Sequence, residues 1–278
     1  MIILNNKKDS VNKIETSVEA ELRFTVPQVD RPVVYLVDYE STTIKLETRM
    51  VKIRNGRTCQ ENFNIEVNGF ELIKFTSELA NVRNSDAVKL IFQPEAENLL
   101  KRLTGARRVL MFHHLARDMR EAPSDDNLGA ATNAHVDHDQ ATYEYNIRRC
   151  LPVGEVDALL NRRWAAYNIW KPIAPVEKLP LAVCDARTVL EKSLIPTDVG
   201  TRPGEPLLPR TGLGVAFDPE QRWFYFPDMT SDEALVLKMW DTDSDRPQWA
   251  AHSAFVDPTS KSDAKPRISL DARFIAFY

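Results

Sequence analysis

The chain has 278 residues, enough for one large domain or two small ones, and its 43% hydrophobic and 27% charged residues are ordinary for a globular protein. A formal net charge of −4 with scattered basic residues excludes the basic stripe that nucleic-acid binding requires. The N-terminal stretch MIILNNKKDS has too short an apolar run for a signal peptide or a membrane span. Three widely spaced cysteines without a C-x-x-C motif favour a reducing compartment. We therefore expect a cytoplasmic monomer or homodimer that binds a small molecule, and neither nucleic acid nor a membrane.

The first part of the chain alternates apolar and polar residues, which is typical of strands, before a helical pattern begins at Pro94. Pro94 suits a first helical turn, and Gly105 suits the residue after a last turn. The elements predicted here are strands over 21–27, 33–39 and 43–53, a hairpin over 63–75 with Asn68 and Gly69 in its turn, and a helix over 94–106.

The remainder of the chain is dominated by short apolar segments separated by proline, glycine and aspartate. This pattern predicts a jelly roll or barrel, and the absence of a regular βαβ alternation and of a G-x-G-x-x-G motif disfavours a dinucleotide-binding fold. The elements predicted here are a strand over 107–117, a helix over 155–167, and strands within 167–173, 179–187, 222–229, 233–241, 250–258 and 267–278.

The segment NAHVDHDQ, residues 133–140, carries two histidines and two aspartates within five positions. On a strand, His135 and Asp137 project to one side, whereas His138 projects to the other. His-x-Asp is therefore a candidate two-ligand unit for a metal ion. The motif is common by chance, so a third ligand must come from a distant strand.

His252 is the only histidine downstream of this segment, because the chain contains five and the other two, His113 and His114, precede it. Two histidines and one carboxylate form the facial triad of non-haem Fe(II) oxygenases, which leaves coordination positions open. Arg267 and Ser269 share one face of the last predicted strand, where a buried arginine can bind the distal carboxylate of a 2-oxo acid. Arg273 lies on the same face and competes for this role.

Asn168 and Trp170 share a face of another predicted strand, where they could contact the co-substrate or the substrate, or simply pack. His113 and His114 are expected to be structural, and His138 to lie at the edge of the site.

The chain resembles the fungal AsaB-type hydroxylase/desaturase family, which includes gibberellin desaturase and the bacterial protein CmcJ. The matching stretches span roughly residues 90–278; they are LTGARRVLMFHHLAR, AHVDHD, NIWKPI, PLAVCDART, RWFYFPDMTSDEALVLKMWD, HSAFVDP and PRISLDARFIAFY.

The resemblance implies an Fe(II)/2-oxoglutarate-dependent oxygenase with a double-stranded β-helix core and flanking helices. It implies iron at His135, Asp137 and His252, 2-oxoglutarate at Arg267, and O2 as the oxidant. We expect one domain, with an N-terminal α/β extension over 1–105 and the core over 106–278. The expected activity is hydroxylation, desaturation or oxidative cyclisation of a small natural-product intermediate.

Two alternatives stay open. NAHVDH differs by one residue, Asn133, from the H-x-H-x-D-H signature of metallo-β-lactamase-type hydrolases, although that fold needs further histidines downstream. The second alternative is a catalytically inactive small-molecule-binding module of the same fold.

Overall fold

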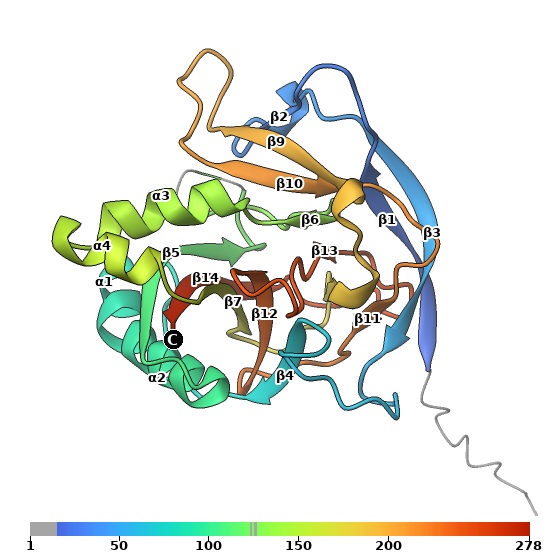
Figure 1. Cartoon of the computed structure of the whole chain (residues 1–278). Helices are drawn as coiled ribbons and strands as arrows, with labels where there is room; N and C mark the ends of the chain where they lie inside the picture. The colour runs from blue at the N-terminus through green and yellow to red at the C-terminus, as the bar shows by residue number, and fades with distance from the viewer. Residues whose placement is uncertain (1–15, 123, 125–126) are drawn as a thin grey trace, which may run out of the picture.

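The computed structural model describes residues 16–278 except 123 and 125–126, and its architecture is mainly β, with two sheets facing each other (Figure 1). The nine-stranded sheet contains, in spatial order, β1 (Ser17–Thr25), β3 (Leu46–Asn55), β11 (Trp223–Tyr225), β8 (Leu181–Cys184), β13 (His252–Ala254), β6 (His135–Val136), β10 (Thr211–Val215), β9 (Leu194–Gly200) and β2 (Val33–Tyr35). The five-stranded sheet contains β4 (Phe70–Lys74), β12 (Glu233–Asp241), β7 (Trp164–Pro172), β14 (Ile268–Phe277) and β5 (Arg108–Asp118).

Helices are few and lie outside the two sheets. They are α1 (Ser85–Ala87), α2 (Gln93–Thr104), α3 (Gln140–Cys150) and α4 (Val153–Leu160), with a π-helical segment η2 (Val88–Phe92) and short 3-10 turns η1 (Tyr39–Ser41), η3 (Ala186–Thr188) and η4 (Glu191–Ser193). Within the described part of the chain, no helix has the length and apolar character needed to cross a bilayer. The predicted β-rich core with flanking helices is confirmed.

The predicted helix near Pro94 is confirmed as α2, and its C-terminus has the expected glycine. Gly105 adopts a left-handed φ of 73° and its N–H donates to Lys101 O. This conformation costs glycine little because it has no Cβ atom.

The two sheets contain strands from both sides of residue 105. β1 and β3 join the nine-stranded sheet, and β4 joins the five-stranded sheet through β12. The proposed division at residue 105 stays a prediction, and residues 1–15 of the predicted extension lie outside the described residues.

The predicted hairpin over 63–75 is wrong. Only β4 is a strand, and it pairs with the distant β12, where Phe70 lies opposite Leu237. Asn68 N–H donates to Asn64 O at 2.8 Å, so the residues before Gly69 form a turn instead of a second strand. The predicted turn at Asn68 and Gly69 is confirmed, because Gly69 has a φ of 78°. This turn leads from a loop into β4 and does not connect two strands.

The predicted helix over 155–167 is also only partly correct. α4 ends at Leu160, and β7 begins at Trp164. All nine residues of β7 are buried, because both of its faces are covered. Its first four residues are all apolar, and such a run does not distinguish a strand from a helix. The predicted strand within 167–173 is confirmed as the second half of β7. The helix α3 was not predicted; its first turn is capped by Asp139, whose Oδ1 accepts from Thr142 N–H at 2.9 Å.

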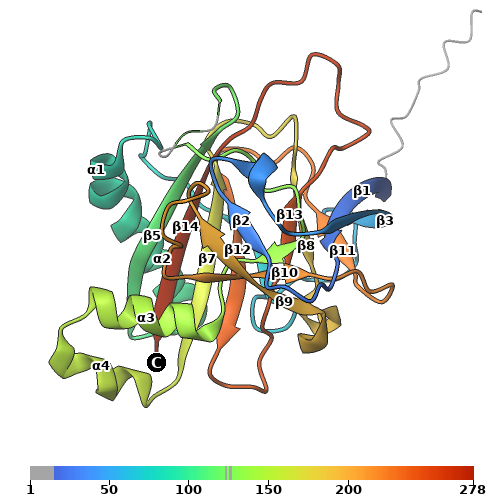
Figure 2. The ribbon, with the colours of Figure 1, turned by 90° about the horizontal axis from the view of Figure 1, so that it is seen from above.

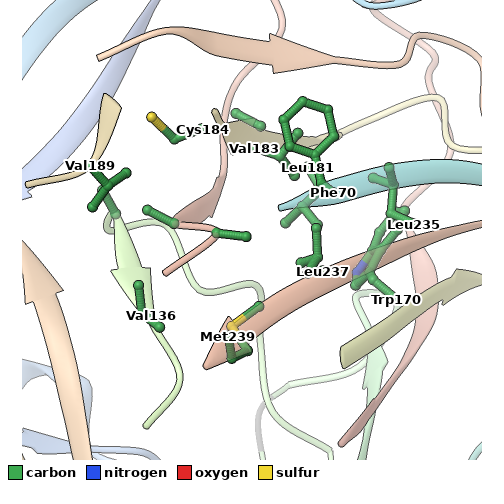
Figure 3. Close-up of a cluster of buried hydrophobic side chains, with 14 of the residues drawn as sticks. Phe70, Val136, Trp170, Leu181, Val183, Cys184, Val189, Leu235, Leu237 and Met239 are labelled. Carbon is green, nitrogen blue, oxygen red and sulfur yellow. The ribbon is translucent and has the colours of Figure 1, made fainter. Parts of the chain in front are cut away.

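The five-stranded sheet separates two hydrophobic cores. Its outer face packs against η2 and α2 (Figures 1 and 2). Phe92 and Leu100 belong to the same buried cluster as Ile169 of β7. Its inner face, which includes Trp170, packs against strands of the nine-stranded sheet. Figure 3 shows part of this cluster, with Val136 and Val183 from the nine-stranded sheet and Leu235 and Leu237 from the five-stranded sheet. The inner core thus surrounds the ends of the strands that carry the candidate ligands.

Candidate metal and co-substrate site

Pairing between β6 and β13 places two of the predicted ligands side by side. His135 lies directly opposite His252, and the centroids of the two imidazole rings are 4.4 Å apart. Asp137 follows β6, which ends at Val136, so the predicted strand is shorter than expected. One nitrogen of each histidine and one oxygen of Asp137 lie within 4.8 Å of one another, so these three residues could hold a metal ion.

Backbone carbonyls orient both imidazoles. The Nδ1 atom of His135 lies 2.8 Å from Asn133 O, and the Nδ1 atom of His252 lies 3.1 Å from Ala250 O. A carbonyl oxygen only accepts, so each Nδ1 carries the hydrogen and each Nε2 keeps a free lone pair. Burial, together with nearby His252, lowers the pKa of His135 to about 3, so its ring is neutral and able to bind a metal at neutral pH.

The Asp137 carboxylate is held from the opposite side of the site by Arg273. Arg273 Nε donates to Oδ2 at 3.1 Å and its Nη2 donates to Oδ1 at 3.0 Å, while Asn168 Nδ2 also donates to Oδ2. Burial alone would raise the pKa of Asp137, but Arg273 and the neighbouring histidines outweigh it and hold this pKa well below its usual range. Oδ1 accepts one of these bonds, lies 3.7 Å from His135 Nε2, and retains a lone pair for a metal.

His138 does not belong to the three-residue group, in agreement with the predicted ligand set. Its ring lies against Tyr143 and Phe112, with centroids 5.6 and 6.4 Å away. His113 is structural in this arrangement, because its Nδ1 lies 3.1 Å from Arg273 Nη1 and must accept from that guanidinium.

Arg267 is a buried cation with no carboxylate partner among the residues that the structure describes. Its Nη1 donates to Leu179 O, its guanidinium lies 5.3 Å from the centroid of the Trp170 ring, and its Nε has no hydrogen-bond partner. Burial, followed by the charge of Arg117, lowers its pKa to about 9, which leaves it charged at neutral pH. Ser269 Oγ is likewise buried without a partner. Two unsatisfied donors of this kind fit a carboxylate ligand from outside the chain.

Two cavities meet at His135. The smaller one is lined by His252, Arg267, Trp170 and other residues, and therefore joins the candidate metal ligands to the free guanidinium. The larger has a volume of about 280 Å³ and opens beside Asp137. The smaller cavity has a volume of only about 20 Å³, so of the two it is the larger that offers room for a small molecule beside the candidate ligands.

The structure brings His135, Asp137 and His252 together, and Arg267 lines the smaller cavity with the two histidines. It places Asn168 against Asp137, and it buries Ser269 on β14 outside the lining of both cavities. The pairing of Arg273 with Asp137 was missed; its position on the inner face of β14 was the available signal. Arg210, which lines the larger cavity, was also missed, and no motif in the sequence marks it.

Comparison with known proteins identifies the family. A family model described as an oxidoreductase/YMDC permease-like domain matches residues 22–277. The chain is 32% identical to the hydroxylase/desaturase CTB9 of Cercospora beticola, over 84% of this chain and 78% of that protein. It is 30% identical to the hydroxylase/desaturase efuI of Hormonema carpetanum, over 86% of each.

A solved structure of the iron and alpha-ketoglutarate-dependent endoperoxidase NvfI has a similar fold. Its TM-score is 0.83 at 24% identity, and the similarity covers 94% of this chain and 98% of that one. The shared fold confirms the predicted double-stranded β-helix core. With relatives of this identity over most of its length, the chain belongs to the AsaB-type hydroxylase/desaturase family that its sequence motifs indicated.

Proposed function

We propose that this chain is an Fe(II)/2-oxoglutarate-dependent oxygenase, with Nε2 of His135, Nε2 of His252 and Oδ1 of Asp137 as metal ligands. One observation carries the proposal: three ligand atoms converge within 4.8 Å of one another, beside a cavity that contains an unpaired buried arginine, Arg267. Two imidazoles and one carboxylate with open positions are the ligand set of this enzyme class.

Each of the other residues has a defined task in this proposal. Arg267 binds the distal carboxylate of 2-oxoglutarate, because it lines the smaller cavity and its Nε has no partner. Ser269, two residues further along, adds a hydrogen bond from its hydroxyl, which is also buried without a partner. Asn168 and Arg273 fix the Asp137 carboxylate, which leaves Oδ1 directed toward His135. The indole of Trp170 shields the Arg267 guanidinium from water.

When bound, iron with 2-oxoglutarate and O2 supplies the oxidising power to remove a hydrogen atom from an unactivated C–H bond. The chain positions one such bond and excludes water from the inner core. The substrate is proposed to be a small natural-product intermediate, since one similar protein is named an aspirochlorine biosynthesis protein, and the relatives CTB9 and efuI are named as hydroxylase/desaturases. Hydroxylation, desaturation and oxidative cyclisation are the candidate outcomes.

The two alternatives have less support. A metallo-β-lactamase-type hydrolase would need more histidines, but the described residues bring together only two histidines and Asp137. An inactive binding module would not require both Nε2 atoms to be free of hydrogen bonds and close to the Asp137 carboxylate, as they are here.

The proposal is tested by measuring how much succinate the protein forms from 2-oxoglutarate when no substrate is added. Fe(II) should support this uncoupled reaction, chelation should abolish it, and Zn(II) should not restore it because zinc has no redox chemistry. Succinate formation that survives chelation, or hydrolytic activity restored by zinc alone, would contradict the oxygenase and favour the hydrolase.

A cytoplasmic location is part of the proposal. Cys59, Cys150 and Cys184 are all free, which suits a reducing compartment. Assembly as a monomer or homodimer stays a prediction.

A further inference from the structure

The larger cavity beside the candidate metal site is lined by four arginines and one carboxylate, that of Asp137. Three of these arginines have partners within the protein. Arg273 pairs with Asp137, Arg117 donates to Gly129 O at 2.5 Å and to Asp271 Oδ2 at 3.5 Å, and Arg23 donates to Thr132.

Arg210 is the exception. Its Nε is buried without a hydrogen-bond partner, and no carboxylate lies within ion-pair distance of its guanidinium in the part of the chain that the structure describes. Burial, followed by the charge of Arg273, lowers its pKa to about 10, which leaves it a cation at neutral pH. Arg210 is half-buried, and its buried Nε is a donor that no group of the protein satisfies. An unsatisfied buried donor on a charged group is unfavourable unless a ligand supplies the acceptor.

The backbone holds Arg210 in place beside the candidate ligands. The next residue begins β10, where Thr211 N–H donates to Thr142 Oγ1 at 2.9 Å, and β10 pairs with β6 so that Gly214 lies opposite His135. Arg210 and His135 therefore line one cavity from two paired segments. The rest of the lining is largely apolar and includes Leu36, Val34, Ile44, Leu115, Leu128, Val199 and Leu213.

We propose that Arg210 is a substrate-binding residue and that the substrate is an apolar small molecule bearing an acidic oxygen group, of which a carboxylate is the simplest form. This inference rests on the proposed function, because it takes the larger cavity as the substrate site. The charge of Asp137 raises the pKa of Arg210, but burial and Arg273 outweigh it, and both Asp137 oxygens are already bonded to Arg273 and Asn168. The guanidinium forms a bidentate, charge-assisted pair with the acid, while the apolar walls bind the carbon skeleton.

The test uses two probes of matched shape, 2-naphthoate and the neutral 2-naphthalenemethanol. Each is titrated into protein loaded with Ni(II) and saturating 2-oxoglutarate, so that the metal and the co-substrate position are filled without turnover. The parent should bind the acid more tightly than the alcohol. Arg210→Gln should raise the Kd of the acid at least about tenfold, equivalent to about 1.4 kcal/mol, and leave the Kd of the alcohol unchanged.

Two further variants make the result specific. Arg210→Lys should recover part of the acid binding, because it restores the charge but not the planar fork. Arg31→Gln is the matched control: Arg31 donates to Thr211 Oγ1 next to Arg210, but it is exposed, pairs with Asp198 and lies outside the cavity. It should leave the binding of both probes unchanged.

Three results would overturn the inference. They are equal weakening of acid and alcohol in Arg210→Gln, no preference for the acid in the parent, and a rise in the KM for 2-oxoglutarate in Arg210→Gln, which would assign the residue to the co-substrate. Succinate formation with Fe(II) is measured on the same preparations. Its absence alongside an Arg210-dependent acid preference would reject the proposed function alone, whereas its presence without that preference would reject this inference alone.

Discussion

Along residues 269–274, the two faces of β14 are equally buried but have opposite chemistry. Leu270, Ala272 and Phe274 point to the outer core beneath α2, whereas Ser269, Asp271 and Arg273 point inward. All six are at most 5% exposed. Burial alone therefore does not distinguish structural from functional residues on this strand; the presence or absence of partners does.

The outer face is complete without a ligand. Its side chains are apolar, and they pack against η2 and α2 in one cluster. On the inner face some hydrogen bonds are unsatisfied, because Ser269 Oγ and the Nε of the adjacent Arg267 have no partners. This difference predicts that substitutions on the outer face lower stability, while substitutions on the inner face lower activity.

The largest effect is expected from the candidate ligands. His135→Ala or Asp137→Ala should abolish turnover and metal binding, because each removes one of three converging ligand atoms. His138→Ala is the matched control from the same segment and should leave a measurable fraction of activity. Succinate release and metal content would be measured on each variant. A His138→Ala protein as inactive as His135→Ala would require the ligand set to be redrawn.

On the outer face, Phe274→Ala should lower the free energy of unfolding by about 3–5 kcal/mol, the usual cost of removing a buried phenyl group. The folded variant should keep the KM of the parent for 2-oxoglutarate. Urea denaturation and kinetics at low temperature would measure both quantities. A large change in KM would mean that the two faces of β14 are not independent.

On the inner face, Arg267→Ala should raise the KM for 2-oxoglutarate by about tenfold to a thousandfold, since a hydrogen bond to a charged group contributes about 1.5–3 kcal/mol and breaking a buried ion pair costs about 3–5 kcal/mol. Arg267→Lys should recover only part of this. Arg273→Ala is the comparison: it should weaken metal binding through Asp137 while changing the KM less. The reverse pattern would assign the co-substrate to Arg273.

The smallest effect concerns His113, whose pKa is lowered from 6.5 to about 2 by burial and then by Arg273. As the pH falls below about 6.5, His113 takes up a proton in the unfolded chain but not in the folded chain. Protonation therefore favours the unfolded state, and the free energy of unfolding decreases as the pH falls below about 6.5. Between about pH 7 and pH 5, His113→Gln should therefore lose less stability than the parent. Equal slopes in urea denaturation would show that His113 is not held neutral.

The candidate ligands could be predicted from the sequence because histidines are rare in this chain and strand alternation relates His135 to Asp137 and Arg267 to Ser269. The position of α2 could be predicted because Pro94 and Gly105 mark its ends. These signals are local, so they survive without knowledge of the fold.

Other features depend on which distant strands pair. β4 pairs with the distant β12, where Phe70 lies opposite Leu237, so the local hairpin pattern was misleading. β7 is covered on both faces, so its apolar run lost the period of a strand. The ion pair of Arg273 with Asp137 likewise depends on the fold, because it joins β14 to the segment after β6. The unsatisfied Nε of Arg210 depends on the position of β10 beside β6.

A crystal structure of the protein with Fe(II) and 2-oxoglutarate, prepared without oxygen, would decide the ligand assignments together. We predict iron bonded to Nε2 of His135, Nε2 of His252 and Oδ1 of Asp137, with the distal carboxylate of 2-oxoglutarate paired with Arg267. Iron on any other set of residues, or that carboxylate on Arg273 or Arg210, would contradict the proposed site.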